Sequence, residues 1–586
     1  FALGSYVSFA ILMLMNEKKP GIGILIFMVW CALGGLRPEV SRAQEALHPP
    51  VFGKFQGLNS PLHIPLVLSG NFGELRQDHF HTGLDFKTEG REGLPVLAAS
   101  DGVVARIKIS PYGYGRALYL SDPQGLTTVY AHLQRFAPML EQYALEQQYA
   151  QQRFGIDQSP KRAFSFVQGD TIGWSGNSGS SGGPHLHFEV RETKTQHPIN
   201  PFFWGFDVPD EVAPELQGLW VLPVDGSRVN GSQRPVRFSP GAQTIRITGK
   251  ARLGLEALDR LDGATNRCGV YRAELYVDEV LWFAWELDTL NFAVSRDMNA
   301  HALYDAWERT GEQVHRLHRL PGNRLPIYEA YRTSAVLDGG DSLAQDIEVR
   351  IWDVHGNQTA GKWQVTFESA PLEQDSGLYR YDQPFDVRNG VASASGPARV
   401  FYEDFEFPFE PKSGDEAWWQ IGPQDMPTSR SIRVELPVDP GARDHTLAVR
   451  KGRGGKIEGV YTGKVIRPDL FSFETKTCGV YRLMQDTVAP NLRPHRQFRT
   501  GDPNVLNVQG AKELRFDLAD DLSGIDAYEA RLDGRWILFR WDPKRERIWY
   551  EVSDQKHRQS SEHVLEIWAR DASGNRVEWR GTVQFE

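Results

Sequence analysis

Short runs of β-branched and aromatic residues recur along this chain and are separated by turns rich in glycine, proline and aspartate. Typical runs are Val103–Ile109, Ala117–Leu120 and Thr127–Tyr130. Runs of this length with such boundaries are typical of β-strands, and 56 Gly and 35 Pro residues supply the turns between them. We therefore expect a mainly β protein built from antiparallel sheets.

The length of 586 residues exceeds what one hydrophobic core normally serves and suggests about three to five domains. Hydrophobic residues make up 40% and charged residues 24% of the chain, which is ordinary for a globular protein. The 65 basic and 75 acidic residues leave a net charge of −10. A general nucleic-acid binder normally carries a basic surface, so nucleic acid is not an expected partner.

The N-terminal region has the pattern of an export signal. Residues 15–43 comprise a basic segment, an apolar run from Gly21 to Leu36, and small residues at Ser41 and Ala43 before a cleavage point. Residues 1–14 are apolar and remain an unassigned upstream segment, and the true start codon is left open. The alternative is an uncleaved anchor, but each apolar run is shorter than the ~18 residues of a typical spanning helix.

Turn and strand patterns divide the remainder into a first unit and three later β modules. Apolar residues at helical spacing interrupt the first unit and predict a helical insert at about 138–163. Residues 207–214 have the composition of a linker. The predicted boundaries are 44–205 for the first unit and 215–370, 371–486 and 487–586 for the modules, of which 371–486 is the least defined.

Two of the later modules share a pattern. A strand ending near Trp352 leads into Asp353–Asn357, and one ending near Trp568 leads into Asp571–Asn575, both reading Asp-x-x-Gly-Asn. Gly and Asn tolerate positive φ, so this turn suits two antiparallel strands. We expect two or three β-sandwich modules of immunoglobulin-like type, of which these two are related. Cys-Gly-Val-Tyr-Arg also occurs twice, and whether its cysteines, Cys268 and Cys478, form a disulfide is left open.

Histidines concentrate in the first unit. In Gly182–Glu189 the side chains of His185 and His187 point to one face of a strand, while Leu186 and Phe188 point to the opposite, core face. Two adjacent imidazoles suit a metal ligand beside an acid or base. An isolated histidine is more often an ordinary core or surface residue than a ligand. We assign that non-functional role to His63, His301, His315, His318 and His355.

An earlier patch, from His79 to Asp85, adds a carboxylate. His81 and Asp85 are four residues apart and share one side of an extended segment. Two histidines and one aspartate form a good zinc ligand set and leave a fourth tetrahedral position for water. This is the open, catalytic type of zinc site, in which the metal activates water and polarises a scissile carbonyl.

The patches His-Thr-Gly-Leu-Asp at 81–85, Tyr-Ala-His-Leu at 130–133 and Gly-Gly-Pro-His-Leu-His-Phe-Glu at 182–189 resemble the signature of the lysostaphin-type zinc endopeptidases, the M23 metallopeptidases. The resemblance covers about 70–205, roughly a quarter of the chain. It says nothing about the later modules. The helical insert departs from the family pattern, and it either flanks the cleft or packs against the next module.

The resemblance implies one zinc ion held by His81, Asp85 and His187. It also implies that His132 and His185 act beside the metal-bound water and the substrate oxyanion, as general base and transition-state stabiliser. Unligated histidines have the pKa range for this role.

Two further residues have open roles. Glu189 shares the face of His187 and either supports the ligand by hydrogen bonding or only packs or faces solvent. His79 is a candidate either to support the ligands, like Glu189, or to replace His81 as a ligand because it lies on the same face, although the His-x-x-x-Asp spacing favours His81.

These features predict an exported zinc metalloendopeptidase of the bacterial periplasm or cell envelope, hydrolysing amide bonds in peptidoglycan stem or cross-bridge peptides. The alternative is a non-catalytic cell-wall binding or activator protein on the same fold. The later β modules are candidates for contact with an envelope partner or activator. The bond cleaved, autoinhibition and oligomeric state are left open.

Overall fold

The computed structural model describes residues 55–585, except for 242–243, 333–334, 339–343, 369–377, 413, 415–417, 425, 440, 442–443 and 553–561. The predicted signal peptide at 15–43 and the segment 1–14 therefore lie outside the described residues. Residues 50–586 belong to one compact unit. Within the described residues, no helix is both long enough and apolar enough to cross a membrane.

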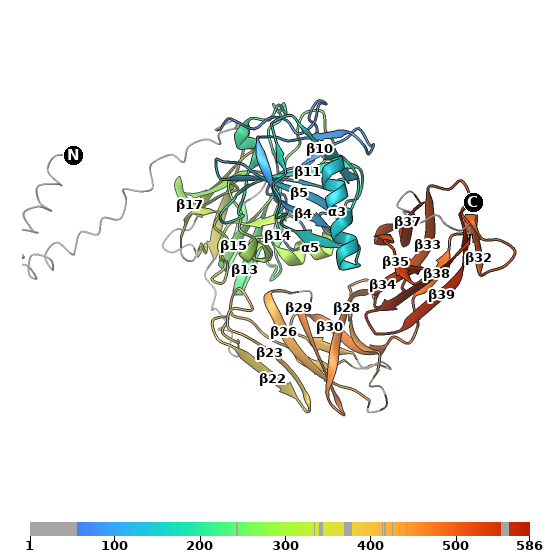
Figure 1. Cartoon of the computed structure of the whole chain (residues 1–586). Helices are drawn as coiled ribbons and strands as arrows, with labels where there is room; N and C mark the ends of the chain where they lie inside the picture. Colours follow the sequence, from blue (N-terminus) through green and yellow to red (C-terminus); the bar gives the residue numbers. More distant parts are fainter. Residues whose placement is uncertain are drawn as a thin grey trace, which may run out of the picture. The chain divides into compact units, whose positions relative to one another are not determined.

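The first region contains a nine-stranded sheet and a three-stranded sheet, both antiparallel (Figure 1). The large sheet has the order β1-β2-β11-β6-β5-β4-β8, with β12 beside β11 and β9 beside β4. Its strands are β1 Leu68–Gly70, β2 Leu84–Lys87, β4 Gly102–Ile109, β5 Arg116–Ser121, β6 Leu126–Ala131, β8 Ile156–Gln158, β9 Ser165–Phe166, β11 His185–Glu192 and β12 Pro198–Ile199. The small sheet comprises β3 Pro95–Leu97, β10 Thr171–Trp174 and β7 Arg135–Phe136.

The predicted helical insert is confirmed as helix α3, Pro138–Gln151, which lies beside the large sheet in Figure 1. Pro138 begins the helix, where its missing N–H costs nothing. The helix ends at Gln152, which takes a left-handed conformation, so it occupies only the first part of the predicted insert at about 138–163. Leu140 and Ala144 are buried on its inner side. The short helix η1, Pro201–Trp204, closes the region.

The second region forms another nine-stranded sheet, with the order β14-β13-β15-β21-β20-β16-β17-β19 and β18 beside β15. Its strands are β13 Glu215–Val229, β14 Val236–Phe238, β15 Ile245–Leu258, β16 Arg272–Val277, β17 Val280–Glu286, β18 Val314–Arg316, β19 Tyr328–Tyr331, β20 Ala344–Trp352 and β21 Gln358–Glu368. It also carries the short helices η2 Phe292–Asp297, α4 Met298–His301 and α5 Tyr304–Thr310.

The least defined module is clearly β in the structure. It forms a nine-stranded sheet with the order β22-β23-β26-β29-β28-β27-β30-β25-β24. The strands are β22 Phe385–Asn389, β23 Ala392–Gly396, β24 Phe409–Pro411, β25 Trp419–Ile421, β26 Pro427–Pro437, β27 Thr446–Lys451, β28 Ile457–Arg467, β29 Leu470–Thr477 and β30 Gly479–Gln485.

The last region has two sheets whose buried side chains form one hydrophobic cluster. One sheet comprises β31 Asn491–Pro494, β33 Glu513–Ala519, β37 Arg547–Glu551 and β36 Arg540–Asp542. The other comprises β32 Val505–Asn507, β39 Arg576–Gln584, β38 Glu562–Asp571, β34 Ile525–Leu532 and β35 Arg535–Trp536. The short helices η3 Arg496–Phe498 and η4 Pro543–Arg545 complete it.

These sheets confirm the expected mainly β, antiparallel fold class. Two strand pairs are parallel, β15 with β21 and β32 with β39. The expected Asp-x-x-Gly-Asn turns do connect antiparallel strands, β20 to β21 and β38 to β39, and the glycine of each turn, Gly356 or Gly574, has a φ of 95°. The predicted domain boundaries and the immunoglobulin-like sandwich type stay predictions.

The first two regions share one hydrophobic core. One continuous cluster runs from Leu58 to Val365 and includes side chains of both nine-stranded sheets, whereas the third and fourth regions have separate clusters. The second region therefore braces the first through shared apolar burial, which is the main stabilising term in folding. Cys268 and Cys478 lie in different clusters and are both free and buried.

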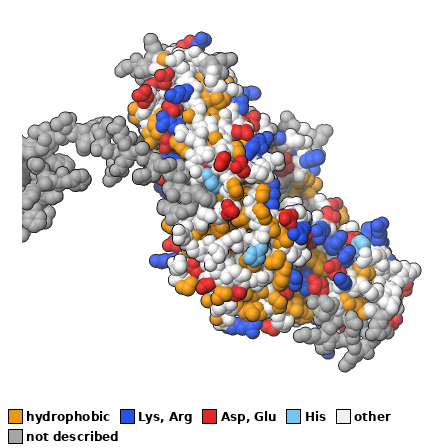
Figure 2. Space-filling model, turned by 90° about the horizontal axis from the view of Figure 1, so that it is seen from above, with side chains coloured by type: hydrophobic (Ala, Val, Ile, Leu, Met, Phe, Trp, Pro, Cys, Tyr) orange, Lys and Arg blue, Asp and Glu red, His pale blue; other side chains and the backbone are white. Residues whose placement is uncertain are grey.

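The face of the molecule seen in Figure 2 mixes acidic and basic side chains with apolar and other groups. On this face, the acidic and basic side chains of the described residues are interspersed, and no large acidic patch is visible among them.

Candidate metal centre

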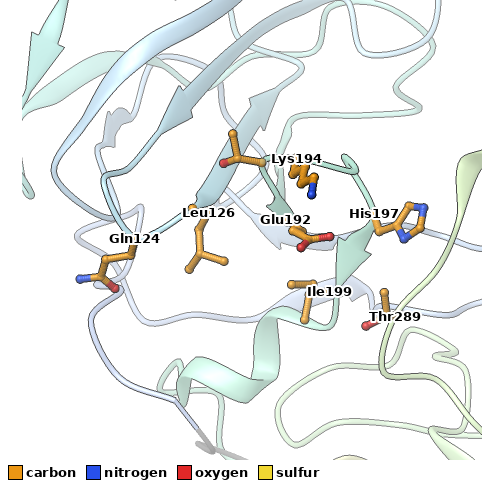
Figure 3. A pocket seen from close by; sticks show the side chains of 9 residues that line it. Gln124, Leu126, Glu192, Lys194, His197, Ile199 and Thr289 are labelled. Carbon is orange, nitrogen blue, oxygen red and sulfur yellow. The ribbon is translucent and has the colours of Figure 1, made fainter.

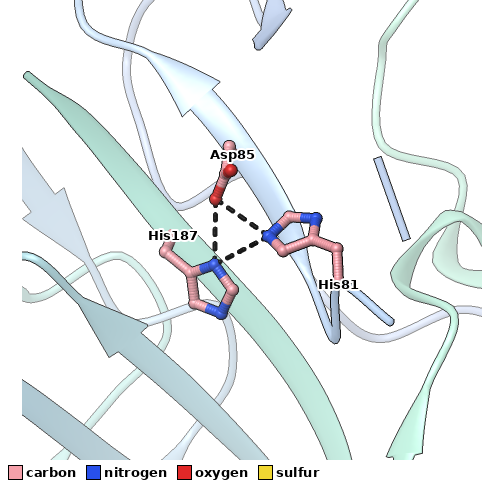
Figure 4. A group of neighbouring side chains, drawn as sticks. All are labelled: His81, Asp85 and His187. Atoms are coloured by element: carbon pink, nitrogen blue, oxygen red, sulfur yellow. Dashed lines mark hydrogen bonds and ion pairs between the residues drawn. The ribbon is translucent and has the colours of Figure 1, made fainter. Parts of the chain in front are cut away.

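Three side chains of the first region converge on one point (Figure 4). Asp85 of β2 and His187 of β11 are directly opposite in an antiparallel pair, so their side chains project from the same face. His81 lies in the segment before β2. The three atoms form a close triangle: His81 Nε2 to Asp85 Oδ1 is 3.1 Å, His187 Nδ1 to Asp85 Oδ1 is 2.9 Å, and His81 Nε2 to His187 Nδ1 is 3.0 Å.

Strand β11 shows why these residues face this way. Leu186 and Phe188 are fully buried in the core, as their alternation predicts. His187, Glu189 and Arg191 alternate with them and line the opposite face, where they are also buried. Because the apolar residues fix which face of the strand meets the core, the polar face is determined at the same time.

His81 is held from behind by a backbone carbonyl. Its Nδ1 lies 2.7 Å from the carbonyl oxygen of Asn71, so Nδ1 carries the proton and donates it, and Nε2 is left towards Asp85 and His187. The side chain of Asn71 is itself fixed, because it donates to the carbonyl of Gly269 at 2.7 Å and accepts from the Gly269 N–H at 2.8 Å. The second region thus braces a residue that orients His81.

Glu189 holds His187 in a similar way. Its Oε1 lies 2.8 Å from His187 Nε2 and accepts hydrogen bonds from Thr82 Oγ1 at 2.6 Å and from the Tyr114 hydroxyl. Its Oε2 accepts from Arg191 Nε at 2.5 Å. Glu189 is completely buried, so it does not face solvent. Of the two roles left open, the contacts match support of His187.

The electrostatics of the group favour a cation. Burial raises the pKa of Asp85, but the charge of His81 and hydrogen bonds from the three histidines outweigh it and hold that pKa well below its usual range. Burial also opposes ionisation of Glu189, yet Arg191 and His187 lower its pKa to about 2. Burial lowers the pKa of His187, but Asp85 and Glu189 together raise it to about 9. Two ionised carboxylates thus stabilise positive charge between them.

Two more histidines lie beside the triangle. His185 Nε2 is 3.4 Å from Asp85 Oδ1, and its Nδ1 is 2.9 Å from the Gly183 carbonyl. His132 Nδ1 is 2.8 Å from the Ser178 carbonyl. The two rings are 4.8 Å apart between centroids. The carbonyls place a proton on each Nδ1. The His185 Nε2 faces the Asp85 carboxylate, whereas no hydrogen bond engages the His132 Nε2 among the described residues.

The backbone at His132 shows why it departs from β6. Its φ of 58° is left-handed, a conformation that histidine adopts more often than bulkier residues do. This bend ends the strand. The ring lies 5.9 Å from that of His187, next to the group of donors. Burial and the neighbouring imidazoles of His187 and His185 lower the pKa of His132 to about 3.

His79 occupies a different environment. It is exposed and does not belong to the group of three donors, which consists of His81, Asp85 and His187. The structure therefore does not place it in competition with His81. Another histidine of the first region, His197, also lies elsewhere: it lines an open surface pocket of about 660 Å³ with Leu126, Glu192 and Thr289 (Figure 3). None of the three donors lines this pocket.

Sequence reasoning did not find the supporting residues Asn71, Tyr114 and Arg191. Arg191 carried a signal, because it lies two residues after Glu189 and therefore on the same strand face. Asn71 contributes through its backbone carbonyl, and Tyr114 reaches Glu189 from a loop before β5. Neither contact leaves a local pattern in the sequence.

Comparison with known proteins finds a family match for the segment that contains His81, Asp85 and His132. The model of peptidase family M23 matches residues 79–148. The chain is 32% identical over 131 residues to the DD-carboxypeptidase/endopeptidase Mpg of Neisseria meningitidis serogroup B, a match covering 22% of this chain and 24% of Mpg. It is 31% identical over 109 residues to an uncharacterized metalloprotease of Haemophilus influenzae, covering 19% of this chain and 18% of that protein.

Among solved structures, the catalytic domain of lysostaphin from Staphylococcus simulans is similar, with 25% identity, a TM-score of 0.17, and coverage of 22% of this chain and 85% of that one. The chain spans about a quarter of the length of the first curated relatives that it matches. Residues 79–148 thus resemble peptidase family M23, and this match includes the first two of the three motifs.

Proposed function

We propose that this protein is a zinc-dependent endopeptidase that hydrolyses amide bonds in the stem or cross-bridge peptides of peptidoglycan. The observation that carries the proposal is the convergence of His81, Asp85 and His187 beside two further histidines, His132 and His185, whose Nδ1 atoms are held by backbone carbonyls. The family match and the name of the Neisseria relative support the choice of substrate.

The donor set fits zinc. Two imidazole nitrogens and one carboxylate oxygen are ligands that zinc prefers, and three protein ligands leave a position open for water or substrate. His81 and His187 donate their other ring N–H to the Asn71 carbonyl and to Glu189, which is how ligating histidines are usually oriented. Two nitrogen lone pairs 3.0 Å apart repel each other unless a cation or a proton lies between them.

When bound, zinc supplies a Lewis acid that polarises the scissile carbonyl and lowers the pKa of water. The proton transfers are then assigned to His132 and His185. With Nδ1 bonded to a backbone carbonyl, the Nε2 of either ring accepts a proton from the attacking water and passes it to the amine that leaves when the C–N bond breaks. While it carries this proton, that ring donates a hydrogen bond to the oxygen that gains charge, and the second ring lies beside it at 4.8 Å between centroids.

The proposal includes export to the periplasm or cell envelope, because peptidoglycan lies outside the cytoplasmic membrane and residues 15–43 have the pattern of a signal peptide. The later β modules remain candidates for contact with an envelope partner.

The test is release of new amino groups from purified cross-linked peptidoglycan by protein that begins at residue 44. We expect release by the zinc-loaded protein, loss of release with a chelator, and recovery when zinc is restored. His132→Ala and His185→Ala should retain zinc but lose most of the rate. Mass analysis of the products then identifies the bond.

A folded, zinc-loaded protein that releases no amino groups yet binds peptidoglycan would contradict the proposal and favour the non-catalytic binding alternative. Release that persists in the chelated protein, or in His187→Ala, would show that a different group performs the hydrolysis.

A further inference from the structure

Two groups of three aspartates lie away from the candidate zinc site, one in the second region and one in the fourth. In each group, one carboxylate oxygen from every member lies within 4.8 Å of those of the others. The first group, named here cluster A, is Asp210, Asp259 and Asp353, and the second, cluster B, is Asp486, Asp520 and Asp571.

The two clusters are built from the same three motifs in the same order. The first aspartate begins Asp-x-Val-Ala-Pro, the second begins Asp-x-Leu-x-Gly, and the third begins Asp-x-x-Gly-Asn. These motifs occupy 210–214, 259–263 and 353–357 in cluster A and 486–490, 520–524 and 571–575 in cluster B. Three matching motifs in matching order indicate one structural unit that occurs twice.

The strands around the clusters repeat as well. The first aspartate precedes the opening strand, β13 or β31, and the second follows the end of β15 or β33. The third lies at the turn before the last strand, and that last strand is in each case also paired in parallel, β21 with β15 and β39 with β32. Three segments distant in the sequence therefore meet at one end of each unit.

The asparagine of the turn makes the same bonds in both clusters. In cluster A, Asn357 Nδ2 donates to the Asp210 carbonyl at 3.0 Å and to Asp353 Oδ2 at 2.8 Å. In cluster B, Asn575 Nδ2 donates to the Asp486 carbonyl at 2.8 Å and to Asp571 Oδ2 at 2.7 Å. The third aspartate is thus held in place from outside the cluster.

The other two aspartates of each cluster leave the same oxygen open. Asp210 Oδ2 and Asp259 Oδ1 are buried without a hydrogen-bond partner among the described residues, and so are the equivalent atoms Asp486 Oδ2 and Asp520 Oδ1. Asp259 and Asp486 are each only 2% exposed. Buried carboxylate oxygens normally find a donor or a metal, so equivalent open oxygens in two clusters point to a ligand.

No side chain supplies a counter-charge common to both clusters within the described part of the chain. His355 Nδ1 lies 3.5 Å from Asp210 Oδ2 in cluster A, but Ser573 stands at the matching place in cluster B. In cluster A, burial chiefly, and then the charges of Asp353 and Asp210, raise the pKa of Asp259 to about 8.

We propose that each cluster binds one calcium ion. The ligand atoms are oxygens, which hard cations prefer, whereas zinc favours the nitrogen-containing set at His81, Asp85 and His187. Calcium accepts six to eight oxygens in flexible geometry, while magnesium requires a near-ideal octahedron and usually keeps several waters rather than using an all-protein set of ligands. Each ion ties the segment that enters its module to two loops at the same end.

The experiment titrates CaCl2 into the zinc-loaded full chain in calcium-free buffer, measured by calorimetry, with MgCl2 in parallel. We expect two calcium ions per chain, one for each cluster. Asp259→Asn should weaken calcium binding at cluster A, and Asp520→Asn should weaken it at cluster B. In each case the affinity of that one site falls at least about tenfold because a charged ligand is lost. The double variant is weakened at both sites.

The matched controls are Asp262→Asn and Asp521→Asn, which make the same change at exposed neighbours of the cluster residues. Both should bind two ions. His187→Ala should also bind two, which separates these sites from the zinc site. Thermal melting adds a second measurement: calcium raises the midpoint of the wild type, whereas without calcium the Asp259→Asn and Asp520→Asn proteins melt at the same temperature or higher, because a repelling charge is gone.

Absence of saturable binding at millimolar calcium would overturn the proposal and indicate that protons neutralise the clusters. Unchanged binding in the Asn variants, or loss of binding in His187→Ala, would assign the ions to other residues. Equal response to magnesium would overturn the choice of calcium.

Discussion

Two buried groups of histidines in this protein have opposite electrostatics. In the first region, His187 contacts Asp85 and Glu189, and despite burial these carboxylates raise its pKa to about 9. The group is therefore arranged to hold positive charge.

In the second region, His301 and His315 are equally buried, with His301 Nε2 2.9 Å from His315 Nδ1. Burial lowers the pKa of His315 to about 4. Burial and the charges of His315 and Arg316 hold the pKa of His301 well below its usual range. Here the surroundings are aromatic, since the ring of Trp285 stacks on His315.

The difference teaches that burial and proximity of imidazoles do not by themselves make a metal site. Both groups have two ring nitrogens about 3 Å apart. Only the first adds a carboxylate as a third donor and another carboxylate behind a ligand, so only the first compensates the desolvation of a bound cation. The predictions below test this contrast.

The largest effect is expected from removal of a donor. His187→Ala should lower the rate of peptide release at least about a thousandfold and abolish stoichiometric zinc, because metal catalysis supplies several kcal/mol and each 1.36 kcal/mol is tenfold in rate. Rate assays and metal analysis measure both. His197→Ala makes the same change away from the donors and should be neutral. Normal zinc content in His187→Ala would break the comparison.

The second histidine group should make the protein sensitive to acid. The unfolded chain binds a proton at His315 near pH 6.5, but the folded chain does so only near pH 4, so stability is lost as pH falls between these values. The difference is worth about 3 kcal/mol. Urea unfolding at pH 7.5, 6, 5 and 4 measures it. His315→Gln should flatten this pH dependence, and an unchanged slope would refute the assignment.

Glu189→Gln tests the same contrast by removing the charge of one supporting carboxylate while leaving the three candidate ligands in place. Because Glu189 fixes His187 through its Nε2, zinc affinity should fall about 10- to 100-fold while the fold is kept. Competition with a chelator of known affinity gives the value. Glu192→Gln, an exposed change on the same strand, is the control and should bind zinc like the wild type. Equal affinities would mean that Glu189 only packs.

The smallest effect is expected at Tyr114, whose hydroxyl donates to Glu189 and not to a candidate metal ligand. Tyr114→Phe removes a hydroxyl that donates to Glu189 and lies 3.1 Å from Thr82 Oγ1. A hydrogen bond to a charged group contributes about 1.5–3 kcal/mol, of which only part reaches the metal, so a fall of about three- to tenfold in zinc affinity is expected. Tyr112→Phe, at an exposed tyrosine of the same loop, should change nothing.

Much of the candidate site was predictable because its motifs are local. Alternation along β11 predicted that His185 and His187 share a face while Leu186 and Phe188 enter the core, and burial of both apolar residues confirms it. Helix α3 and the two Asp-x-x-Gly-Asn turns were likewise predictable, since proline, glycine and helical spacing act within a few residues.

The supporting contacts were not predictable because they depend on strand register and on distant segments. Asp85 stands opposite His187 only because β2 and β11 pair in that register. Asn71 is fixed by Gly269, nearly two hundred residues later in the chain. The calcium proposal shows the same limit: the third motif of each cluster was evident as a turn, but its meeting with the other two aspartates was not.

The amino-acid sequence by itself thus determined the mainly β fold class, the helix in the first region and the residues of the M23 motifs, because strand alternation and turn chemistry act through neighbouring residues. The tertiary structure decided which donors meet, which carboxylates support them, and where aspartates gather. Those outcomes depend on long-range packing and register, which bring together side chains that no local pattern connects.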